Sequence, residues 1–209
     1  MNPANQLVML VKYPVPGKTK TRLTPHLTSQ QAALVHREIS ERVLSSVLKS
    51  KVRVPFELEI HYEGGDLDLM KGWLGALETY TPQSTGDLGE RITSLLKRHY
   101  RTPDKRIVLI GSDCPFLEHE LLALAFDSLK TTSLVIGPAF DGGYYLIGTD
   151  GFYPELFEDI PWGSERVYWE TLKRATLLGL KAKILKPLHD IDRPEDLRLW
   201  EELKSEKSL

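Results

Sequence analysis

Short apolar runs alternate along the chain with longer stretches in which apolar residues recur at helical spacing. The run Ile107–Ile110 is hydrophobic at every position, which is typical of a strand buried on both faces of a parallel sheet. We expect strands at Leu7–Val11, Glu57–Tyr62, Glu78–Thr81, Ile107–Ile110, Leu134–Gly137, Tyr144–Gly148 and Ala182–Leu185.

Helical patterns with start signals fill most of the intervals between these strands. Thr28 and Gln31 form a capping box, and Pro194 occupies the favoured first turn of a terminal helix. The expected helices run from Thr28 to about Lys49, from Leu67 to Leu77, from Asp87 onward, from Leu117 to Leu129, from Ser164 to about Leu178, and from Pro194 onward.

The alternation of strands and helices predicts an α/β fold. Two expected strands, residues 134–137 and 144–148, have no helix between them, so the sheet is mixed but mostly parallel. The 209 residues are 41% hydrophobic and fit one domain, which we place at residues 1–204, with a frayed tail at 205–209.

Charge and cysteine content narrow the class of protein. The net charge is −2 and basic residues are scattered, which argues against nucleic acid or an anionic membrane as a partner. The single cysteine, Cys114, excludes an internal disulfide and fits a reducing compartment. We see no secretory signal and no apolar run near the roughly 18 residues of a membrane helix, so we expect a cytoplasmic protein.

Asp113 lies just past the apolar run that ends at Ile110, after the tight turn Gly111-Ser112. Ligands of open α/β sheets bind at the carboxyl ends of the strands, where an aspartate can hold a divalent cation against a phosphate. Alternatively, Asp113 only caps a helix beginning near Phe116. The adjacent Cys114 has no histidine near it in the sequence, and the carboxylate beside it disfavours a thiolate, so we interpret it as a small buried residue.

A basic loop follows the first expected strand, at residues 12–22. It combines four cations with two prolines and a glycine: Lys12, Lys18, Lys20, Arg22, Pro14, Pro16 and Gly17. Backbone N–H groups in such a loop can surround phosphate oxygens while lysine and arginine neutralise their charge. The spacing is not that of a Walker A motif. The loop therefore predicts a phosphate site or, alternatively, an exposed basic loop.

A glycine turn at Gly86 precedes the helix that begins near Asp87. Free N–H groups at a helix start favour an anion or a base edge, and Glu90 and Arg91 are placed to orient such a ligand. Alternatively, Thr85 or Asp87 only caps the helix.

Residues 140–145 combine one acid, Asp141, with two glycines and aromatic faces, a set that suits close approach of a sugar or another polyhydroxylated group. A tight hairpin explains the same residues, because Asp-Gly is a strong turn signal. Residues 161–164 form a further candidate loop for closing over a substrate, unless Trp162 belongs to the core.

Two acids, Asp190 and Asp192, follow the last expected strand. In an extended segment they point the same way, so one or both would approach a metal ion, Mg²⁺ or Mn²⁺, held by Asp113. Such an ion would activate a pyrophosphate leaving group. Alternatively, Asp192 is only the N-cap of the terminal helix. We interpret five scattered histidines as surface or structural residues: His26, His36, His61, His99 and His119.

Five sequence blocks stand in order along almost the whole chain. They are Lys12-x-Pro14-x-Pro16-Gly17-x-x-Lys20-Thr21-Arg22-Leu23, Gln83-x-x-Gly86-Asp87-Leu88-Gly89-Glu90-Arg91, Gly111-Ser112-Asp113-Cys114-Pro115, Gly137-Pro138-Ala139-x-Asp141-Gly142-Gly143-Tyr144-Tyr145-Leu146-Ile147-Gly148 and Asp190-Ile191-Asp192-x-Pro194-Glu195-Asp196-Leu197. Together they resemble the bacterial DUF2064 family, the selenodomain-associated or arsenosugar-biosynthesis type of glycosyltransferase in the nucleotide-diphospho-sugar transferase (GT-A) superfamily. The resemblance implies a single-domain, GT-A-like, three-layer α/β/α sandwich.

The family is also similar to small nucleotidyltransferases, in which the first loop holds a triphosphate and aspartates hold the metal. For this chain the resemblance implies phosphate contacts, a base site, a metal site of Mg²⁺ or Mn²⁺, and a sugar or acceptor site. The phosphate contacts are Lys12, Gly17, Lys20 and Arg22, and the base site is Gln83 and Gly86. The metal ligands are Asp113 with Asp190 or Asp192, and the sugar or acceptor site is Asp141 with Tyr144. Asp141 is the candidate catalytic base.

Three functions follow from this reading. The first is a metal-dependent glycosyltransferase that moves a sugar from a nucleotide sugar to a small acceptor, with mostly electrostatic catalysis. The second is a nucleotidyltransferase that joins a nucleoside triphosphate to a phosphorylated or acidic small molecule and releases pyrophosphate. The third is a nucleotide-binding protein without turnover, because fold alone does not establish activity.

Overall fold

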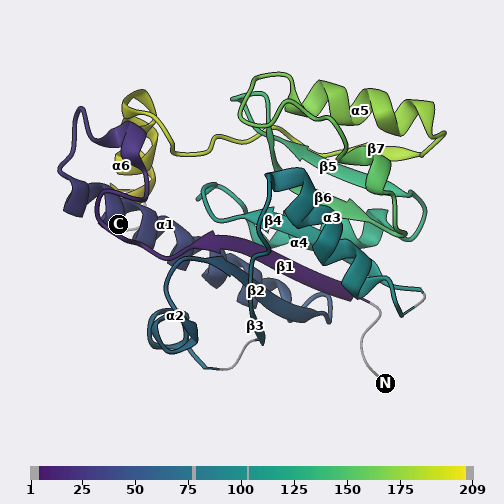
Figure 1. Cartoon of the computed structure of the whole chain (residues 1–209), viewed down its shortest axis with the longest axis horizontal. Coiled ribbons are helices and arrows are strands. Elements are labelled where there is room, and N and C mark those ends of the chain that lie inside the picture. Colours follow the sequence, from purple (N-terminus) through teal and green to yellow (C-terminus); the bar gives the residue numbers. More distant parts are fainter. Residues whose placement is uncertain (1–4, 77–78, 103, 206–209) are drawn as a thin grey trace.

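The computed structural model describes residues 5–76, 79–102 and 104–205 of the chain. Within these residues, seven strands form one sheet in the order β3-β2-β1-β4-β6-β5-β7 (Figure 1). They are β1 Asn5–Lys12, β2 Glu57–Glu63, β3 Thr79–Pro82, β4 Arg106–Gly111, β5 Leu134–Pro138, β6 Tyr144–Thr149 and β7 Ala182–Ile184. Strand β6 is antiparallel to β4 and β5, and the other pairs are parallel. The predicted mixed, mostly parallel sheet is confirmed.

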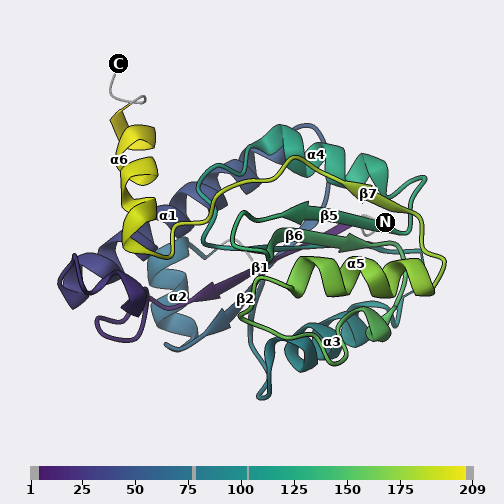
Figure 2. The same cartoon turned by 90° about the horizontal axis from the view of Figure 1, so that it is seen from above.

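Helices cover both faces of the sheet. They are α1 Ser29–Ser50, α2 Leu67–Leu74, α3 Leu88–His99, α4 His119–Ser128, α5 Val167–Leu177 and α6 Leu197–Ser205, with 3₁₀ turns η1 Thr21–Leu23, η2 Pro154–Leu156 and η3 Pro194–Asp196. Figure 2 shows α1 and α4 on one face, and α3 and α5 on the other. The fold is therefore the expected three-layer α/β/α sandwich.

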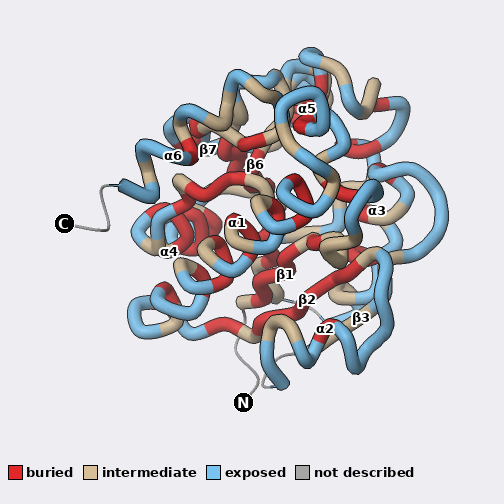
Figure 3. Tube along the Cα trace, turned by 90° about the vertical axis from the view of Figure 1, so that its left-hand side faces the viewer, coloured by how far each residue is buried: buried red, intermediate tan, exposed pale blue. Residues whose placement is uncertain are grey.

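The layers follow from the alternation of side chains along the strands. In β1, Leu7 and Met9 join the core beneath α1 and α4, whereas Val8 points to the core beneath α3 and α5. Both cores consist mainly of buried aliphatic and aromatic side chains, and the buried trace runs through the middle of the molecule in Figure 3. Burial on both faces explains why the central strands are continuously hydrophobic.

The order of the strands creates a crevice at one edge of the sheet. Strand β1 pairs in parallel with β2 on one side and with β4 on the other. The chain reaches β2 through α1 on one face, and it reaches β4 through α3 on the opposite face (Figures 1 and 2). After β1 the chain moves to β2 on one side of the β1–β4 pair, and after β4 it moves through α4 to β5 on the other side, so the two connections diverge along the sheet. Such a switch point is where open α/β sheets bind ligands.

Most predicted element bounds hold to within a few residues, and the differences have local causes. Helix α2 ends at Leu74 rather than Leu77, because Gly75 takes a positive φ of 96° as its C-cap. Ser164 does not cap α5: the N-cap is Arg166, and the Ser164 hydroxyl only accepts a bond from the Arg166 N–H. Ser205 is the last residue of α6, and the remainder of the expected tail lies outside the described residues.

One polar cluster is buried at β2, away from the switch point. The carboxylate of Glu59 is 3% exposed and pairs with Arg98 and with His99 Nε2, the latter at 2.9 Å, while His61 Nδ1 lies 3.4 Å away. Burial raises the pKa of Glu59, but the bonds from His61, His99 and Arg98 outweigh it and hold the pKa well below its ordinary range. The cluster ties α3 to β2.

No helix in the described part of the chain has the length and apolar character needed to span a bilayer.

Candidate active site

A cleft of about 780 Å³ opens beside the carboxyl end of β4. Its walls come from the loop after β4, the β5–β6 hairpin, residues 162–165 and the segment 189–196, and Arg22 lies at its border. The cleft therefore brings together four regions that are far apart in the sequence. Of the predicted site residues, it contains Arg22, Asp113, Asp141, Tyr144, Asp190 and Asp192.

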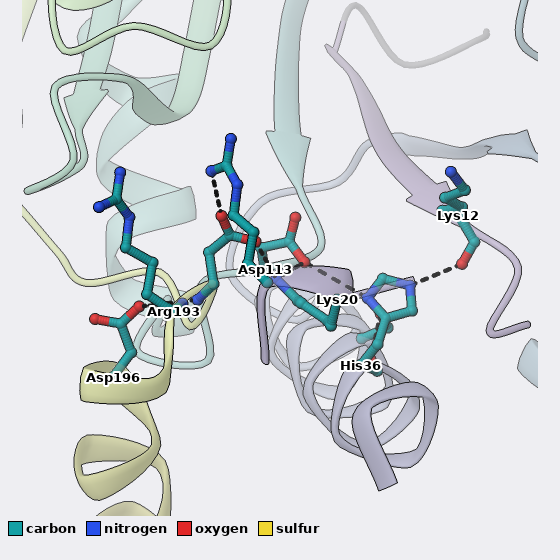
Figure 4. A network of polar contacts seen from close by, with 9 residues as sticks. Lys12, Lys20, His36, Asp113, Arg193 and Asp196 are labelled. Carbon is teal, nitrogen blue, oxygen red and sulfur yellow. Dashed lines mark hydrogen bonds and ion pairs between the residues drawn. The ribbon is translucent and has the colours of Figure 1, made fainter. Parts of the chain in front are cut away.

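A buried lysine joins the loop after β1 to two of these acids. Lys20 Nζ lies 2.6 Å from Asp113 Oδ1 and 3.8 Å from Asp192 Oδ1, and the Lys20 side chain is only 4% exposed (Figure 4). The Lys20 backbone is left-handed, with φ of 50°, a conformation that is uncommon and costly for a residue with a side chain. The surrounding structure therefore holds a cation between the two carboxylates.

Asp113 also faces a histidine of α1. His36 Nδ1 lies 3.5 Å from Asp113 Oδ1, and His36 Nε2 lies 2.8 Å from the carbonyl oxygen of Lys12 (Figure 4). Burial raises the pKa of Asp113, but the charges of Lys20 and His36 outweigh it and keep the pKa well below its ordinary range. Asp113 is thus a carboxylate at neutral pH. It does not cap a helix, because α4 begins later, with Glu118 as its N-cap.

Asp192 is held in place by the start of the terminal helix without being its cap. The N-cap position belongs to Arg193, and Asp196 Oδ2 accepts the N–H groups of Asp192 at 3.0 Å and Arg193 at 2.7 Å. The N-cap alternative for Asp192 is therefore wrong. Its carboxylate instead pairs with Arg22 at 2.7 Å and faces Lys20.

Asp190 lies in the same cleft but in a different electrostatic environment. Burial and the nearby carboxylates of Asp141 and Asp113 raise the pKa of Asp190 to about 6, and the charge of Lys20 only partly opposes them. A carboxyl group with such a pKa is able to exchange a proton near neutral pH.

The Asp-Gly-Gly segment is a tight hairpin that also forms a wall of the cleft. The Asp141 carboxylate accepts the N–H of Gly143 at 2.8 Å, and the N–H of Tyr168 donates to the carbonyl of Gly142 at 2.9 Å. Gly142 has a φ of 90°, and a Cβ there would lie 2.2 Å from the carbonyl oxygen of Glu165. The hairpin interpretation and the interpretation as a binding segment therefore do not exclude each other, because the turn positions Asp141 at the cleft.

Tyr144 and Trp162 pack against each other at the cleft, with ring centroids 6.3 Å apart and nearly perpendicular planes. The Tyr144 hydroxyl is buried, and this burial raises its pKa. Only the ring of Tyr144 is therefore available to a ligand. Trp162 is partly buried: it packs against the core beneath α3 and α5 and also forms part of the wall of the cleft.

The remaining predicted residues lie outside the walls of this cleft. Lys12 and Arg91 both pair with Glu63, at 3.3 Å and 2.9 Å. Arg91 also donates to Gln83 Oε1 and to the carbonyl of Gly86, so these residues form one network across the ends of β1, β2 and β3. The start of α3 is closed by an Asp87–Glu90 capping box, as the capping alternative predicted. Gly17 lies in the exposed loop after β1, with a φ of 77°.

Three residues of the site were not singled out from the sequence. His36 was interpreted as surface or structural, and its contact with Asp113 arises only because α1 packs beneath β4 and β1. Glu63 ends a strand without any motif around it, and Glu165 is one of many exposed acids. Cys114 is buried as predicted, and burial raises its pKa to about 12, so it is no nucleophile.

The described acids of the cleft do not by themselves form a metal-binding cluster. Among the described residues, no group of three or more His, Cys, Asp or Glu side chains is arranged to hold a metal ion. Asp113 and Asp192 nevertheless converge on one cation, Lys20 Nζ. Mg²⁺ commonly takes one or two protein carboxylates and completes its shell with substrate phosphates and water. Asp113 and Asp192 supply two such carboxylates, and a phosphorylated substrate would have to supply the rest of the shell.

Comparison with known proteins identifies the family. Residues 47–164 match the family model described as "Uncharacterized protein conserved in bacteria (DUF2064)". A crystal structure from Desulfovibrio desulfuricans, described as a "putative nucleotide-diphospho-sugar transferase", is 36% identical, with a TM-score of 0.82 over 92% of this chain and 84% of that chain. The chain therefore belongs to the DUF2064 family and has the fold of the nucleotide-diphospho-sugar transferases, which confirms the resemblance inferred from the sequence blocks.

More distant structures share the fold. CMP:2-keto-3-deoxy-manno-octonic acid synthetase in complex with CTP is 10% identical and has a TM-score of 0.56 over 97% of this chain and 99% of that chain. A manganese complex of Rv0371c from Mycobacterium tuberculosis is 17% identical and has a TM-score of 0.54 over 95% of this chain and 97% of that chain. No curated protein matches the sequence.

Proposed function

We propose that the protein is a transferase that uses a nucleotide-activated donor, and that it moves a sugar from a nucleotide sugar to a small acceptor. The observation that carries the proposal is the Lys20–Asp113–Asp192 cluster at the switch point of the sheet. Carboxylates that share a cation at this edge are suited to bind a metal diphosphate. The similarity to the 36% identical structure from Desulfovibrio desulfuricans supports the same class of donor.

The charge of the cleft favours a neutral acceptor. Two arginines line it, Arg22 and Arg193, against six acids: Asp113, Asp141, Glu165, Asp190, Asp192 and Asp196. A phosphorylated or carboxylate acceptor would be repelled by such a wall, whereas the hydroxyl groups of a sugar can donate hydrogen bonds to it. The acidic wall therefore supports glycosyl transfer over transfer of a nucleotidyl group to an acidic acceptor.

The same acidity calls for a cation beside the donor diphosphate. We assign Mg²⁺ or Mn²⁺ to Asp113 and Asp192 rather than Asp190, because Lys20 Nζ draws the first two carboxylates together, whereas the pKa of Asp190 is raised and a protonated carboxyl group is a poor ligand. When bound, the ion would neutralise negative charge on the departing diphosphate. The manganese complex of a protein with the same fold is consistent with this assignment.

The side chains of this chain would do the remaining work. Arg22 would stabilise the diphosphate as it gains charge, and the buried Lys20 and His36 would hold Asp113 in position. Asp141, fixed by the N–H of Gly143, is the group we assign to accept the proton of the acceptor hydroxyl. The network at Gln83 and Gly86 is our candidate for the base site.

Nucleotidyl transfer is the second candidate, since the CTP complex of the octonic acid synthetase has the same fold. The two reactions differ in their products. We would incubate the full chain and Mn²⁺ with nucleotide sugars and, separately, with nucleoside triphosphates, and identify the phosphorylated products. Release of a nucleoside diphosphate from a nucleotide sugar would support glycosyl transfer, whereas release of pyrophosphate from a triphosphate would replace it with nucleotidyl transfer.

A protein without turnover is the third candidate, and a pair of matched variants separates it from the enzymes. Asp113→Asn removes one charge from the cluster, while Asp127→Asn removes one charge from an exposed pair on α4. Turnover that is lost in the first variant and kept in the second supports either enzyme. Tight nucleotide binding by the wild type, with no turnover and no effect of Asp113→Asn, would contradict both.

A further inference from the structure

An exposed aromatic side chain lines the cleft. Phe140 is 59% exposed although it is a large apolar residue, and it lines the cleft next to Asp141. Its ring stacks on the imidazole of His189, with centroids 4.1 Å apart and an interplanar angle of 23°. One face of Phe140 is thus covered by His189, which also lines the cleft.

The two rings are held together by the backbone and not by side-chain packing alone. The N–H of Phe140 donates to the carbonyl of Leu188 at 3.1 Å, and the N–H of Leu188 donates to the carbonyl of Pro138 at 3.1 Å. A parallel bridge between Ala139 and Leu188 continues this pairing beyond β5. The stack is therefore built on a short extension of the sheet, which gives it a fixed position.

The surroundings of the stack specify the kind of molecule that fits it. Phe140 offers an apolar surface, while Asp141, Glu165 and Asp190 supply hydrogen-bond acceptors in the same cleft. Binding sites usually combine apolar surface with a few placed polar groups in this way. A pyranose ring has the matching chemistry, because its C–H groups form an apolar face and its hydroxyls donate hydrogen bonds at the edge.

We infer that the Phe140–His189 stack is the acceptor platform, and that the acceptor is a neutral, ring-shaped, polyhydroxylated compound. The C–H face of this compound lies on Phe140, and its hydroxyls reach Asp141 and the neighbouring acids. Phe140 then determines specificity for the acceptor without taking part in donor cleavage. This inference rests on the proposed glycosyl transfer and names the substrate class of its second site.

The test compares acceptor use with donor use in Phe140→Ala, Phe140→Leu and Phe140→Trp. Phe152→Ala serves as a control, because Phe152 is also an exposed aromatic but lies outside the walls of the cleft. Donor hydrolysis is measured with nucleotide sugars and no acceptor. Acceptor use is measured as KM for methyl glycosides of common hexoses, with hexose phosphates as anionic competitors. Binding of the same methyl glycosides is followed by saturation-transfer NMR, which needs no turnover.

We expect Phe140→Ala and Phe140→Leu to raise the acceptor KM about tenfold or more, because loss of an aromatic contact is worth about that factor. Donor hydrolysis should stay within about twofold of the wild type, and Phe140→Trp should retain acceptor binding. An unchanged acceptor KM in Phe140→Ala would overturn the inference, as would an equal loss of donor hydrolysis. A preference of the wild type for hexose phosphates would also overturn it.

The same measurements separate a failure of the proposed glycosyl transfer from a failure of the Phe140 platform. Methyl glycosides that bind the wild type but not Phe140→Ala would support the platform even if no nucleotide sugar is cleaved. Donor hydrolysis without binding or transfer to any neutral sugar would overturn the platform and leave the donor assignment intact.

Discussion

Replacing Asp113 by asparagine tests the charge cluster most sharply. The substitution keeps the size of the side chain but removes the carboxylate that lies 2.6 Å from Lys20 Nζ. The ammonium of Lys20 is then left almost fully buried with Asp192, 3.8 Å away, as its remaining partner in the cluster. We therefore expect a loss of stability as well as of turnover.

The size of the loss follows from the burial of the two partners. Removing one partner of a fully buried pair costs about 3–5 kcal/mol, whereas an exposed pair is worth about 0–1 kcal/mol. The Lys20 side chain is 4% exposed and that of Asp113 is 48% exposed, so this pair lies between the two cases. We expect Asp113→Asn to lower the free energy of unfolding by about 2 kcal/mol, which corresponds to about 4–8 °C in Tm for a domain of this size.

Urea unfolding, followed by tryptophan fluorescence, measures this change, and a double-mutant cycle with Lys20→Met isolates its cause. If the cost arises from a Lys20 ammonium left buried without Asp113, the double variant should lose less stability than the two single variants together. We expect its loss in free energy of unfolding to be smaller than their sum by about 1 kcal/mol or more. Asp127→Asn, at an exposed pair, should change stability by no more than about 0.5 kcal/mol. Additive effects of Asp113→Asn and Lys20→Met would show that the cost does not arise from an unpaired Lys20 ammonium.

Three further predictions concern single positions. Gly142→Ala should destabilise the protein by about 2–3 kcal/mol in thermal unfolding, because its Cβ would meet the Glu165 backbone. Gly17→Ala, with a positive φ but no neighbouring atom, should cost only about 1 kcal/mol, and equal costs for the two variants would contradict the close contact between Gly142 and Glu165. Glu59→Gln should cost about 3 kcal/mol at neutral pH, because an ionised carboxylate is lost from a buried cluster. The pKa of Glu59 is lowered in the folded state, so the extra stability of the wild type over Glu59→Gln is present above the unfolded pKa near 4.5 and is lost as pH falls below it. A stability difference that does not change with pH in urea titrations would show that the charge of Glu59 is not its cause. Cys114 should resist a thiol reagent until the protein unfolds, because burial raises its pKa to about 12; rapid labelling of the native protein would show that the thiol is accessible.

The order and type of the strands and helices could be predicted from the sequence because each carries a local signal. The buried run Ile107–Ile110 and the capping box at Thr28 both lie where the pattern placed them. The end of α2 could not be located because the apolar pattern continues past Gly75, and only the backbone conformation of that glycine ends the helix.

The candidate site was predictable in part for a similar reason. Asp113, Asp141 and the acids at 190 and 192 follow strands, and the topology of a mostly parallel sheet brings strand ends together. Which acid pairs with which cation depends on packing between distant segments, such as the position of His36 on α1. Local sequence carries no signal for such a contact.

Calorimetric titration of the full chain with nucleoside diphosphates, in the presence of Mn²⁺ and, separately, of EDTA, tests most directly whether the Asp113–Asp192 cluster holds a metal diphosphate. We expect the wild type and Asp127→Asn to bind one diphosphate selectively and only with Mn²⁺, and we expect Asp113→Asn to lose this binding. Binding that is equally tight in EDTA or in Asp113→Asn would contradict a metal diphosphate site at this cluster, and the absence of binding for every nucleotide would contradict a nucleotide-activated donor.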